Sequence, residues 1–410
     1  MANELKHVST GIAITQAQYE STLSHIFNSQ ATGDTMYASS ATQLSRLGIG
    51  ATNKILTVIG GVPTWQSTLA GLSLTSPIFT GTVTIPAGTT TLTPASMGQL
   101  PHRNAIINGA ALVNQRVSAY TLVKDTYGIS GDRWYGMATG TAVSAGTFTN
   151  TAAANCGVSG YAFKFVAVTL TGTGIIYHRY RMEAKDAVRF KNQTASFRCQ
   201  VYQDTGGAIN YTIYVRKANA ADNFAAVTAI SDSGAISVPN TTATSLPYLA
   251  IAMGDCSNGI EIEIKVAAGA ITTKNFEFTE LQLELSSVAT PYEYRPFQQE
   301  LALCQRYYEK SYDDGVAPAT ATNVGSSWIT CPGGSAYIKI SVVLKATKRT
   351  TPTIVWYSFD GTAGKATLAG ADQNFVTNTA GTNAISGQLD NVTPTEGQDL
   401  AAQFTAAAEL

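Results

Sequence analysis

GIEIEIKVAA (259–268) and KNFEFTELQLEL (274–285) are the two stretches of sequence that decide the fold. In the first, glutamate and isoleucine alternate from Glu261 to Ile264, and in the second Glu277 stands between two phenylalanines. Successive side chains of a β-strand point to opposite faces of its sheet, so an alternation with a period of two indicates a strand with one buried face. Both stretches are therefore expected to be strands of an antiparallel sheet.

Strand patterns of this kind recur from residue 104 to about residue 296. Their number and lengths predict an antiparallel β-sandwich of about 190 residues. Further examples are YAFKFVAVTL (161–170), TASFRCQVYQ (194–203) and NYTIYVRKA (210–218).

The pattern changes after the sandwich. Residues 298–312 (QQELALCQRYYEKSY) have helical spacing, and strands return from about residue 325 with SSWITC, SAYIKISVVLK and PTIVWYSF. This order predicts a short helix followed by a second, smaller β-domain. The residues expected on one face of the helix are Leu301, Cys304, Tyr308 and Tyr312.

Before the sandwich, residues 13–29 have the spacing of one short amphipathic helix, followed by β-prone pieces around Met36–Tyr37 and Ile55–Ile59. Its apolar face would contact a neighbouring copy of the chain or a larger particle. An ordinary helix packed within a globular domain would show the same spacing. The residues on the apolar face are Ile14, Tyr19, Leu23, Ile26 and Phe27.

Residues 69–94 alternate apolar residues with threonine or serine, and they are interrupted by Pro77, Pro86 and Pro94. Prolines at such intervals cannot lie in the middle of a sheet. A single chain of such short strands cannot bury its apolar side, whereas three stacked copies can form a fibrous β-stem. A threonine-rich linker is the alternative interpretation.

The composition excludes several classes of protein. Charged residues make up 13% of the chain, roughly half of the ~25% of an ordinary globular domain. With 26 Lys and Arg against 27 Asp and Glu, the net charge is 26 − 27 = −1, which argues against an electrostatic nucleic-acid binder. The 44% of hydrophobic residues argues against a disordered chain, and the lack of a long apolar run argues against a membrane span. So few charges suit a β-rich protein that packs against copies of itself.

The cysteines and the N-terminal residues bear on the compartment. Five cysteines are widely spaced and no CxxC occurs, which argues against a zinc site or a disulfide framework and favours buried free thiols. Residues 1–25 lack the basic and apolar regions of a secretory leader. We therefore expect synthesis in a reducing cytoplasm.

No catalytic, metal or cofactor site is expected. HExxH and GxSxG are both missing, as is a phosphate-binding glycine-rich loop. Glu261 and Glu263 would share a strand face, as a glycosidase pair requires, but so do charges on any solvated strand. Asp313–Asp314–Gly315 is interpreted as a turn rather than a metal site.

Candidate carbohydrate-binding residues come from the aromatic side chains. Sugars stack their apolar C–H faces on aromatic rings while polar groups hydrogen-bond the hydroxyls. Trp134 and Tyr135 follow the polar pair Asp132–Arg133. On the strand 175–183, Tyr177, Arg179 and Arg181 share one face, and His178 and Tyr180 share the other. Core packing is the alternative for each aromatic residue, and a structural Asp–Arg pair beside a buried Trp134 is the alternative for the first group.

Several segments, taken together, resemble tailed-bacteriophage fibre and appendage proteins. LTSPIFTGTVTIP resembles their short stem motif, and residues 31–65 resemble a segment near their start. RNAIINGAALVNQR and GDRWY resemble the opening of a carbohydrate-binding-module-like jelly roll in phage structural proteins, residues 280–312 resemble its close, and QFTAAAEL resembles its final strand. The departures at Leu285–Ser286 and Tyr292 are conservative. The segments named by sequence are residues 74–86, 103–116, 131–135 and 403–410.

The resemblance implies a homotrimeric virion fibre, made in the host cytoplasm, whose N-terminus attaches to phage tail or capsid proteins. Its distal β-domains would contact host cell-surface polysaccharide without catalysis, nucleic-acid binding or membrane insertion. The implied fold is mainly β. Its parts are an N-terminal virion-attachment region (1–65), a trimeric stem (66–102), a jelly-roll β-sandwich (103–297), a linker helix (298–312) and a C-terminal β-domain (313–410).

Other interpretations stay open at this stage. The chain could be a structural head fibre or capsid decoration protein with no receptor role, or a capsule depolymerase. A bacterial carbohydrate-binding protein that is not viral is a further alternative, and the missing leader and the stem motif count against it.

Overall fold

The computed structural model describes most of the chain. The described residues are 15–17, 31–41, 43–52, 54–66, 102–152, 154–332, 334 and 338–410. The proposed stem segment 69–94 lies outside them, and so do all five anchor candidates, which are Ile14, Tyr19, Leu23, Ile26 and Phe27. The chain divides into two compact units, Met1–Thr91 and Leu92–Leu410, which are considered separately.

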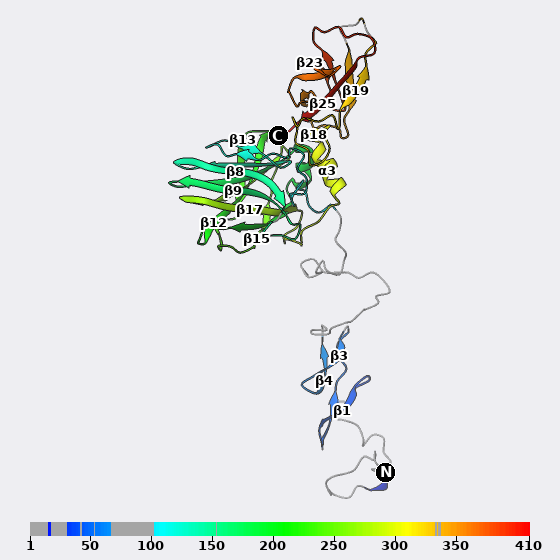
Figure 1. Cartoon of the computed structure of the whole chain (residues 1–410). Helices are drawn as coiled ribbons and strands as arrows, with labels where there is room; N and C mark the ends of the chain where they lie inside the picture. Colours follow the sequence, from blue (N-terminus) through cyan, green and yellow to red (C-terminus); the bar gives the residue numbers. More distant parts are fainter. Residues whose placement is uncertain are drawn as a thin grey trace. The chain divides into compact units, whose positions relative to one another are not determined.

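The described part of the first unit consists of two antiparallel strand pairs, coloured blue in Figure 1. The second pair is a tight hairpin whose turn residues Gly60 and Gly61 have φ of 60° and 83°, values that glycine adopts without strain. The indole of Trp65 donates to the main-chain oxygen of Gly48 at 2.8 Å. The two predicted β-prone pieces are therefore strands. The strands are β1 (Thr35–Ser40), β2 (Gln43–Leu47), β3 (Ile55–Ile59) and β4 (Val62–Gln66).

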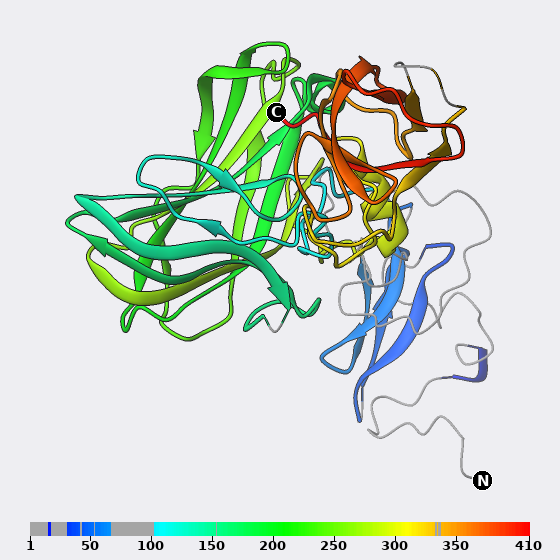
Figure 2. The same cartoon turned by 45° about the horizontal axis from the view of Figure 1, so that its top comes forward.

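The second unit begins with the expected β-sandwich, whose described strands form a seven-stranded and a six-stranded antiparallel sheet (Figure 2). The first sheet has the order β13-β12-β16-β10-β7-β6, with β14 paired to β12, and the second has the order β15-β11-β17-β9-β8-β5. The first sheet contains β6 (Gly128–Ile129), β7 (Trp134–Thr139), β10 (Ile175–Met182), β12 (Ile209–Ala220), β13 (Asn223–Asp232), β14 (Ile236–Val238) and β16 (Ile260–Val266). The second contains β5 (Tyr120–Thr121), β8 (Ala142–Ala152), β9 (Tyr161–Thr171), β11 (Thr194–Gln203), β15 (Thr244–Ala252) and β17 (Ile271–Glu284).

The core of the sandwich is aromatic and contains one histidine. The ring of His178 stacks on Trp134 and on Phe278, with centroids 4.5 and 4.7 Å apart. Burial lowers the pKa of His178 to about 3, so the imidazole is neutral in the folded protein. The inward side chains of β10 and β16 are fully buried, as their period of two predicted.

Two short helical segments follow β10, and a longer helix follows the sandwich. They are α2 (Ala184–Ala187), the 3₁₀ helix η3 (Val188–Phe190) and α3 (Phe297–Gln305). Leu301 and Cys304 of α3 pack on the sandwich core, as expected. The helix is shorter than the predicted range 298–312. It ends at Gln305, because the following residues form strand β18 (Tyr308–Lys310), which pairs with β25 (Asp399–Ala407).

The smaller C-terminal β-domain is also present, in orange and red in Figure 1. Among the described residues it is an eight-stranded sheet centred on β25, to which β18, β19, β21 and β22 all pair. Its core contains Trp356, Phe375 and Phe404. The other strands are β19 (Ser327–Thr330), β20 (Lys339–Val343), β21 (Thr353–Tyr357), β22 (Lys365–Leu368), β23 (Ala371–Ala380) and β24 (Ala384–Leu389).

All five cysteines fall among the described residues and are buried free thiols, which confirms that prediction. No helix in the described parts of the chain is long and apolar enough to cross a membrane.

Candidate functional site

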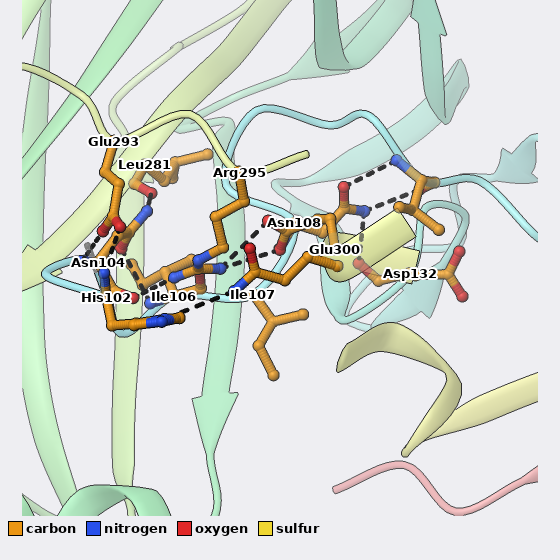
Figure 3. A network of polar contacts seen from close by, with 12 residues as sticks. His102, Asn104, Ile106, Ile107, Asn108, Asp132, Leu281, Glu293, Arg295 and Glu300 are labelled. Carbon is orange, nitrogen blue, oxygen red and sulfur yellow. Dashed lines mark hydrogen bonds and ion pairs between the residues drawn. The ribbon is translucent and has the colours of Figure 1, made fainter. Parts of the chain in front are cut away.

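Residues 103–116 and 280–312, which lie at the two ends of the sandwich, meet in one polar network, which Figure 3 shows. Asn104 and Asn108 come from residues 103–116, and Glu293, Arg295 and Glu300 come from residues 280–312. The main-chain N–H groups of Asn104 and Asn108 donate to the carboxylates of Glu293, at 2.6 Å, and of Glu300. Arg295 pairs with Glu300 at 3.1 Å. The network therefore joins the two ends of the sandwich to each other and, through Glu300, to α3.

The polar pair before β7 is structural as well. The guanidinium of Arg133 is fully buried, lies 3.5 Å from the ring centroid of Tyr307, and pairs with Glu409 at 2.6 Å. The Asp132 carboxylate is also buried and accepts from the main-chain N–H of Gln115 at 2.7 Å. Burial raises the pKa of Asp132 to about 6, although Arg116 opposes the shift. These groups tie the C-terminal β-domain to the sandwich.

Trp134 is a correction to the predicted carbohydrate-binding residues. It is 0% exposed, and its ring lies between the two sheets against His178. The alternation of β7 puts Trp134 on the buried side and Tyr135 on the opposite side. A ring in this position has no face left for a sugar, so the alternative of core packing holds here.

The other four candidates do lie together, on the outer face of the seven-stranded sheet. Across the strands, Arg179 is opposite Tyr135 on one side and opposite Glu263 on the other. Glu263 is in turn opposite Tyr214 of β12. We call this outer surface the sheet face. It is made of three cross-strand rows, which are Tyr214–Glu263–Arg179–Tyr135, Arg216–Glu261–Arg181 and Thr212–Lys265–Tyr177–Met137.

Ion pairs order the side chains of the first two rows. Arg216 pairs with Glu261 at 3.1 Å and with Glu263 at 2.8 Å, and Arg181 pairs with Glu261 at 2.9 Å. The phenolic hydroxyl of Tyr127 donates to Glu263. Burial raises the pKa of Tyr127 well above its usual range, so this proton stays in place. Both glutamates are buried and engaged by arginines, which is the arrangement of a structural charge row rather than of a free catalytic pair.

The rows differ in what they leave accessible. Tyr135 donates its hydroxyl to the main-chain oxygen of Leu410 at 3.1 Å, and Arg181 donates to the same oxygen at 3.4 Å. The guanidinium of Arg179 lies 3.3 Å from the ring centroid of Tyr127. Tyr177 and Tyr214 are half-buried, and the guanidinium of Arg216 lies over the ring of Tyr214, 4.8 Å from its centroid. Tyr177 and Tyr214 are therefore the rings that a ligand can reach.

The sequence did not identify Tyr127, which contacts Glu263 and Arg179 of the sheet face, or the row residues Tyr214 and Arg216. The last two lie two positions apart in NYTIYVRKA, so the period-two rule could have placed them on one face. Only the register of β12 against β16 shows that this is the face of Arg179. Tyr127 precedes β6 in a loop, and no local pattern identifies it.

Asp313–Asp314–Gly315 forms the predicted turn, in which the main-chain N–H of Val316 donates to the oxygen of Asp313 at 3.2 Å. Across the described residues, no three His, Cys, Asp or Glu side chains are grouped as a metal ion would require.

Comparisons with known proteins show structural likeness only. No protein-family model matches the sequence, and no curated protein matches it. Among solved structures, the chain is similar to the carbohydrate-binding module TmCBM61 in complex with β-1,4-galactotriose, with 10% identity over 45% of this chain and 99% of that one, at a TM-score of 0.28. It is also similar to the C-terminal family 22 carbohydrate-binding module of Clostridium thermocellum Xyn10B, with 10% identity over 39% of this chain and 89% of that one, at a TM-score of 0.28.

A third similar structure is the enzymatically active domain of tailspike protein 4 of bacteriophage CBA120. The identity is 14% over 45% of this chain and 22% of that one, at a TM-score of 0.29. Similarities at this level assign neither a ligand nor an activity to this chain.

Proposed function

We propose that this chain binds glycans through the sheet face, without catalysis. The observation that carries the proposal is the cross-strand arrangement of Tyr177, Tyr214 and Arg179, which places two accessible rings and a guanidinium on one ordered surface. Pyranose rings stack on such aromatic faces through their C–H groups, and guanidinium N–H groups donate to hydroxyl and carboxylate oxygens. Strands hold these groups more rigidly than loops would, so little ordering is needed on binding.

The charge of the sheet face indicates the kind of glycan. The rows carry four cations against two glutamates, which leaves two positive charges in excess. The cations are Arg179, Arg181, Arg216 and Lys265, and the glutamates are Glu261 and Glu263. Arginine only donates hydrogen bonds, so the surface offers more donors than acceptors. A glycan rich in acceptors, such as an acidic polysaccharide, matches this surface best.

We further propose that the chain is a homotrimeric fibre of a tailed bacteriophage, attached to the particle by residues 1–65 and contacting the host with its β-domains. The stem motif and the low charge content support this placement. So does the first unit, in which Met36, Val58 and Ile59 are each more than half exposed. Isolated two-stranded hairpins are marginal in water, so copies of the same chain would supply the missing partner for these side chains.

Trimeric presentation would supply the affinity. A single shallow face binds weakly, but linked sites can raise the overall affinity by about 10² to 10⁴ without a new contact. The whole particle would then bind a polysaccharide coat tightly, while each single sheet face could still bind and release its glycan.

A structural fibre or decoration protein without a receptor role is the second candidate. It is favoured by the state of the sheet face, where Glu261 and Glu263 are already paired and Tyr135 and Arg181 already contact Leu410. In that case the rows would serve only to stabilise the sheet.

Cell adsorption by the purified full chain distinguishes these candidates. We expect fluorescently labelled wild-type protein to bind encapsulated host cells and Tyr177→Ala/Tyr214→Ala to bind at least tenfold less. Tyr202→Ala is the matched control, because Tyr202 is a half-buried tyrosine on β11 of the other sheet. Equal binding by all three proteins would refute the sheet-face proposal, and release of new reducing ends would identify a depolymerase.

Deletion of residues 1–30 tests the placement in the particle. The truncated protein should fail to enter virions while its circular dichroism spectrum stays that of a folded β-protein. Normal incorporation of the truncated chain would contradict the anchor assignment.

A further inference from the structure

A cavity of about 420 Å³ lies apart from the sheet face, where the sandwich, the start of α3 and the turn after β18 meet. A volume of this size falls within the range of small-molecule sites. Its walls come from five separate parts of the chain. The lining residues are Ala111, Leu112, Asn114 and Val117, then residues 150–152 at the end of β8, then Tyr161, Phe297, Asp314 and Gly315.

Side-chain hydrogen bonds fix the wall formed by Asn114, Val117 and Asn150. The amide of Asn150 donates to the main-chain oxygen of Val113 at 3.0 Å, and the amide of Asn114 donates to the main-chain oxygen of Asn150 at 3.1 Å. The side-chain oxygen of Asn114 accepts from the N–H of Val117 at 2.9 Å. This loop is therefore built before any ligand arrives, which lowers the cost of binding.

The same wall carries backbone strain. Val117 has φ of 49°, a conformation in which a β-branched residue is an outlier. Such residues persist only where the surrounding contacts enforce them, and they concentrate at ligand sites. Here the enforcing contact is the bond from Val117 to Asn114.

The exposed lining residues Tyr161, Phe297 and Asp314 bring aromatic and acceptor groups to the cavity. Tyr161 is 41% exposed and Phe297 is 37% exposed, so both rings can be reached by solvent. Asp314 is exposed, and neither its carboxylate nor the Tyr161 hydroxyl makes a hydrogen bond to another described residue. The cavity thus combines two apolar ring faces with an available acceptor and an available hydroxyl.

We propose that this cavity is a second carbohydrate site, which binds one neutral hexopyranose residue with Tyr161 or Phe297 against its C–H face and Asp314 accepting from its hydroxyls. Two aromatic faces beside a small set of polar groups are what recognition of a pyranose ring needs. The site is independent of the sheet face, since it shares no residue with the three rows.

Charge sets the specificity of this second site. No arginine or lysine is among the described residues that line the cavity, and Asp314 brings a negative charge to its rim. Lys310 is buried behind the turn and donates its ammonium group to the main-chain oxygen of Val316 at 2.6 Å. Burial lowers the pKa of Lys310, and the charge of Asp314 opposes that shift, so the buried ammonium group partly offsets Asp314. A sugar carboxylate would still meet the Asp314 carboxylate at the rim, so we expect uronic acids to bind more weakly than neutral sugars. The sheet face, with its excess of cations, should instead prefer acidic sugars.

Ligand-observed NMR titration of the full chain tests this proposal. The probes are the methyl glycosides of glucose, galactose and mannose, and methyl glucuronide. We expect wild type to bind at least one neutral glycoside with a dissociation constant in the millimolar range, and to bind the glucuronide at least tenfold more weakly.

Variants then locate the binding. Tyr161→Ala and Asp314→Asn should each weaken the binding of the neutral glycoside at least tenfold. Asp314→Asn should also reduce the difference in affinity between the neutral glycoside and methyl glucuronide. Tyr161→Phe should keep most of the affinity, because the ring is retained. Tyr177→Ala/Tyr214→Ala removes the accessible rings of the sheet face and should leave this binding unchanged.

Two results would overturn the proposal. One is that no neutral glycoside binds wild type below about 50 mM, a limit that corresponds to less than 2 kcal/mol. The other is that binding survives Tyr161→Ala and Asp314→Asn in full. If binding is lost only in Tyr177→Ala/Tyr214→Ala, the sheet-face proposal stands and the cavity proposal fails. Tyr161 and Asp314 are exposed, so circular dichroism should show an unchanged fold for Tyr161→Ala and for Asp314→Asn.

Discussion

Replacing Glu409 by glutamine should weaken the joint between the sandwich and the C-terminal β-domain. The Glu409 carboxylate accepts from Arg133 at 2.6 Å and from Arg116 at 3.2 Å. Arg133 is fully buried, and it stays charged in the variant. Burial alone would lower the pKa of Arg133, but the Glu409 charge raises it above its usual value. The substitution therefore leaves a buried cation without its partner.

The size of the effect follows from these contacts. Removing one member of a buried ion pair costs about 3–5 kcal/mol. Two features reduce that cost here. The glutamine oxygen can still accept one bond, and Arg116 keeps its pair with Asp132 at 3.1 Å. We therefore expect a loss of about 2–3 kcal/mol in the free energy of unfolding.

Urea denaturation of the full chain, followed by tryptophan fluorescence, measures this loss. Glu396→Gln is the control, because Glu396 is exposed and should change the free energy of unfolding by less than about 0.5 kcal/mol. The double variant Arg133→Met/Glu409→Gln should lose less free energy of unfolding than the sum of the losses in the two single variants, since it leaves no unpaired buried charge. A loss below about 0.5 kcal/mol in Glu409→Gln would refute the reasoning.

Three further predictions concern the sandwich. Because the pKa of His178 is lowered to about 3, the unfolded chain gains a proton that the folded chain refuses, so stability is full above pH 6.5 and falls on acidification. Between pH 7 and pH 4 the wild type should lose about 3 kcal/mol more of its free energy of unfolding than His178→Phe does. Urea denaturation at both pH values measures the two losses. Gly136→Ala should destabilise by about 1–3 kcal/mol in the same assay, because its Cβ would lie 2.6 Å from the ring of Phe148. Tyr127→Phe should cost about 1–3 kcal/mol, since the buried Glu263 loses a donor, and a neutral result would contradict the proposed charge rows.

Local alternation predicted the sandwich because it reports burial directly. In IIYHRYRM, the structure buries His178 and Tyr180 and turns Tyr177, Arg179 and Arg181 outward, which is the division that the period of two implies. The same rule does not say which of the two faces of a strand is the buried one. For β7 it therefore separates Trp134 from Tyr135 without showing that Trp134 is inside.

Features that depend on distant pairing could not be predicted locally. The spacing around Tyr308 fits a helix and a strand equally well. Tyr308 lies in a strand because β25, about ninety residues later in the chain, pairs with it. The cavity has the same origin, since Asn114, Tyr161 and Asp314 belong to separate segments that only the tertiary fold brings together. The polar network of Figure 3 has the same origin, because the main-chain N–H groups of Asn104 and Asn108 reach Glu293 and Glu300 only across about 190 residues of chain.

The central claim is that the sheet face binds glycan, and calorimetric titration with purified acidic capsular polysaccharide tests it most directly. We predict saturable binding by wild type and by the control Tyr202→Ala. For Tyr177→Ala/Tyr214→Ala we predict at least tenfold weaker binding, about 1.4 kcal/mol or more. Equal affinities for the three proteins, or no heat of binding by a correctly folded wild type, would contradict the claim.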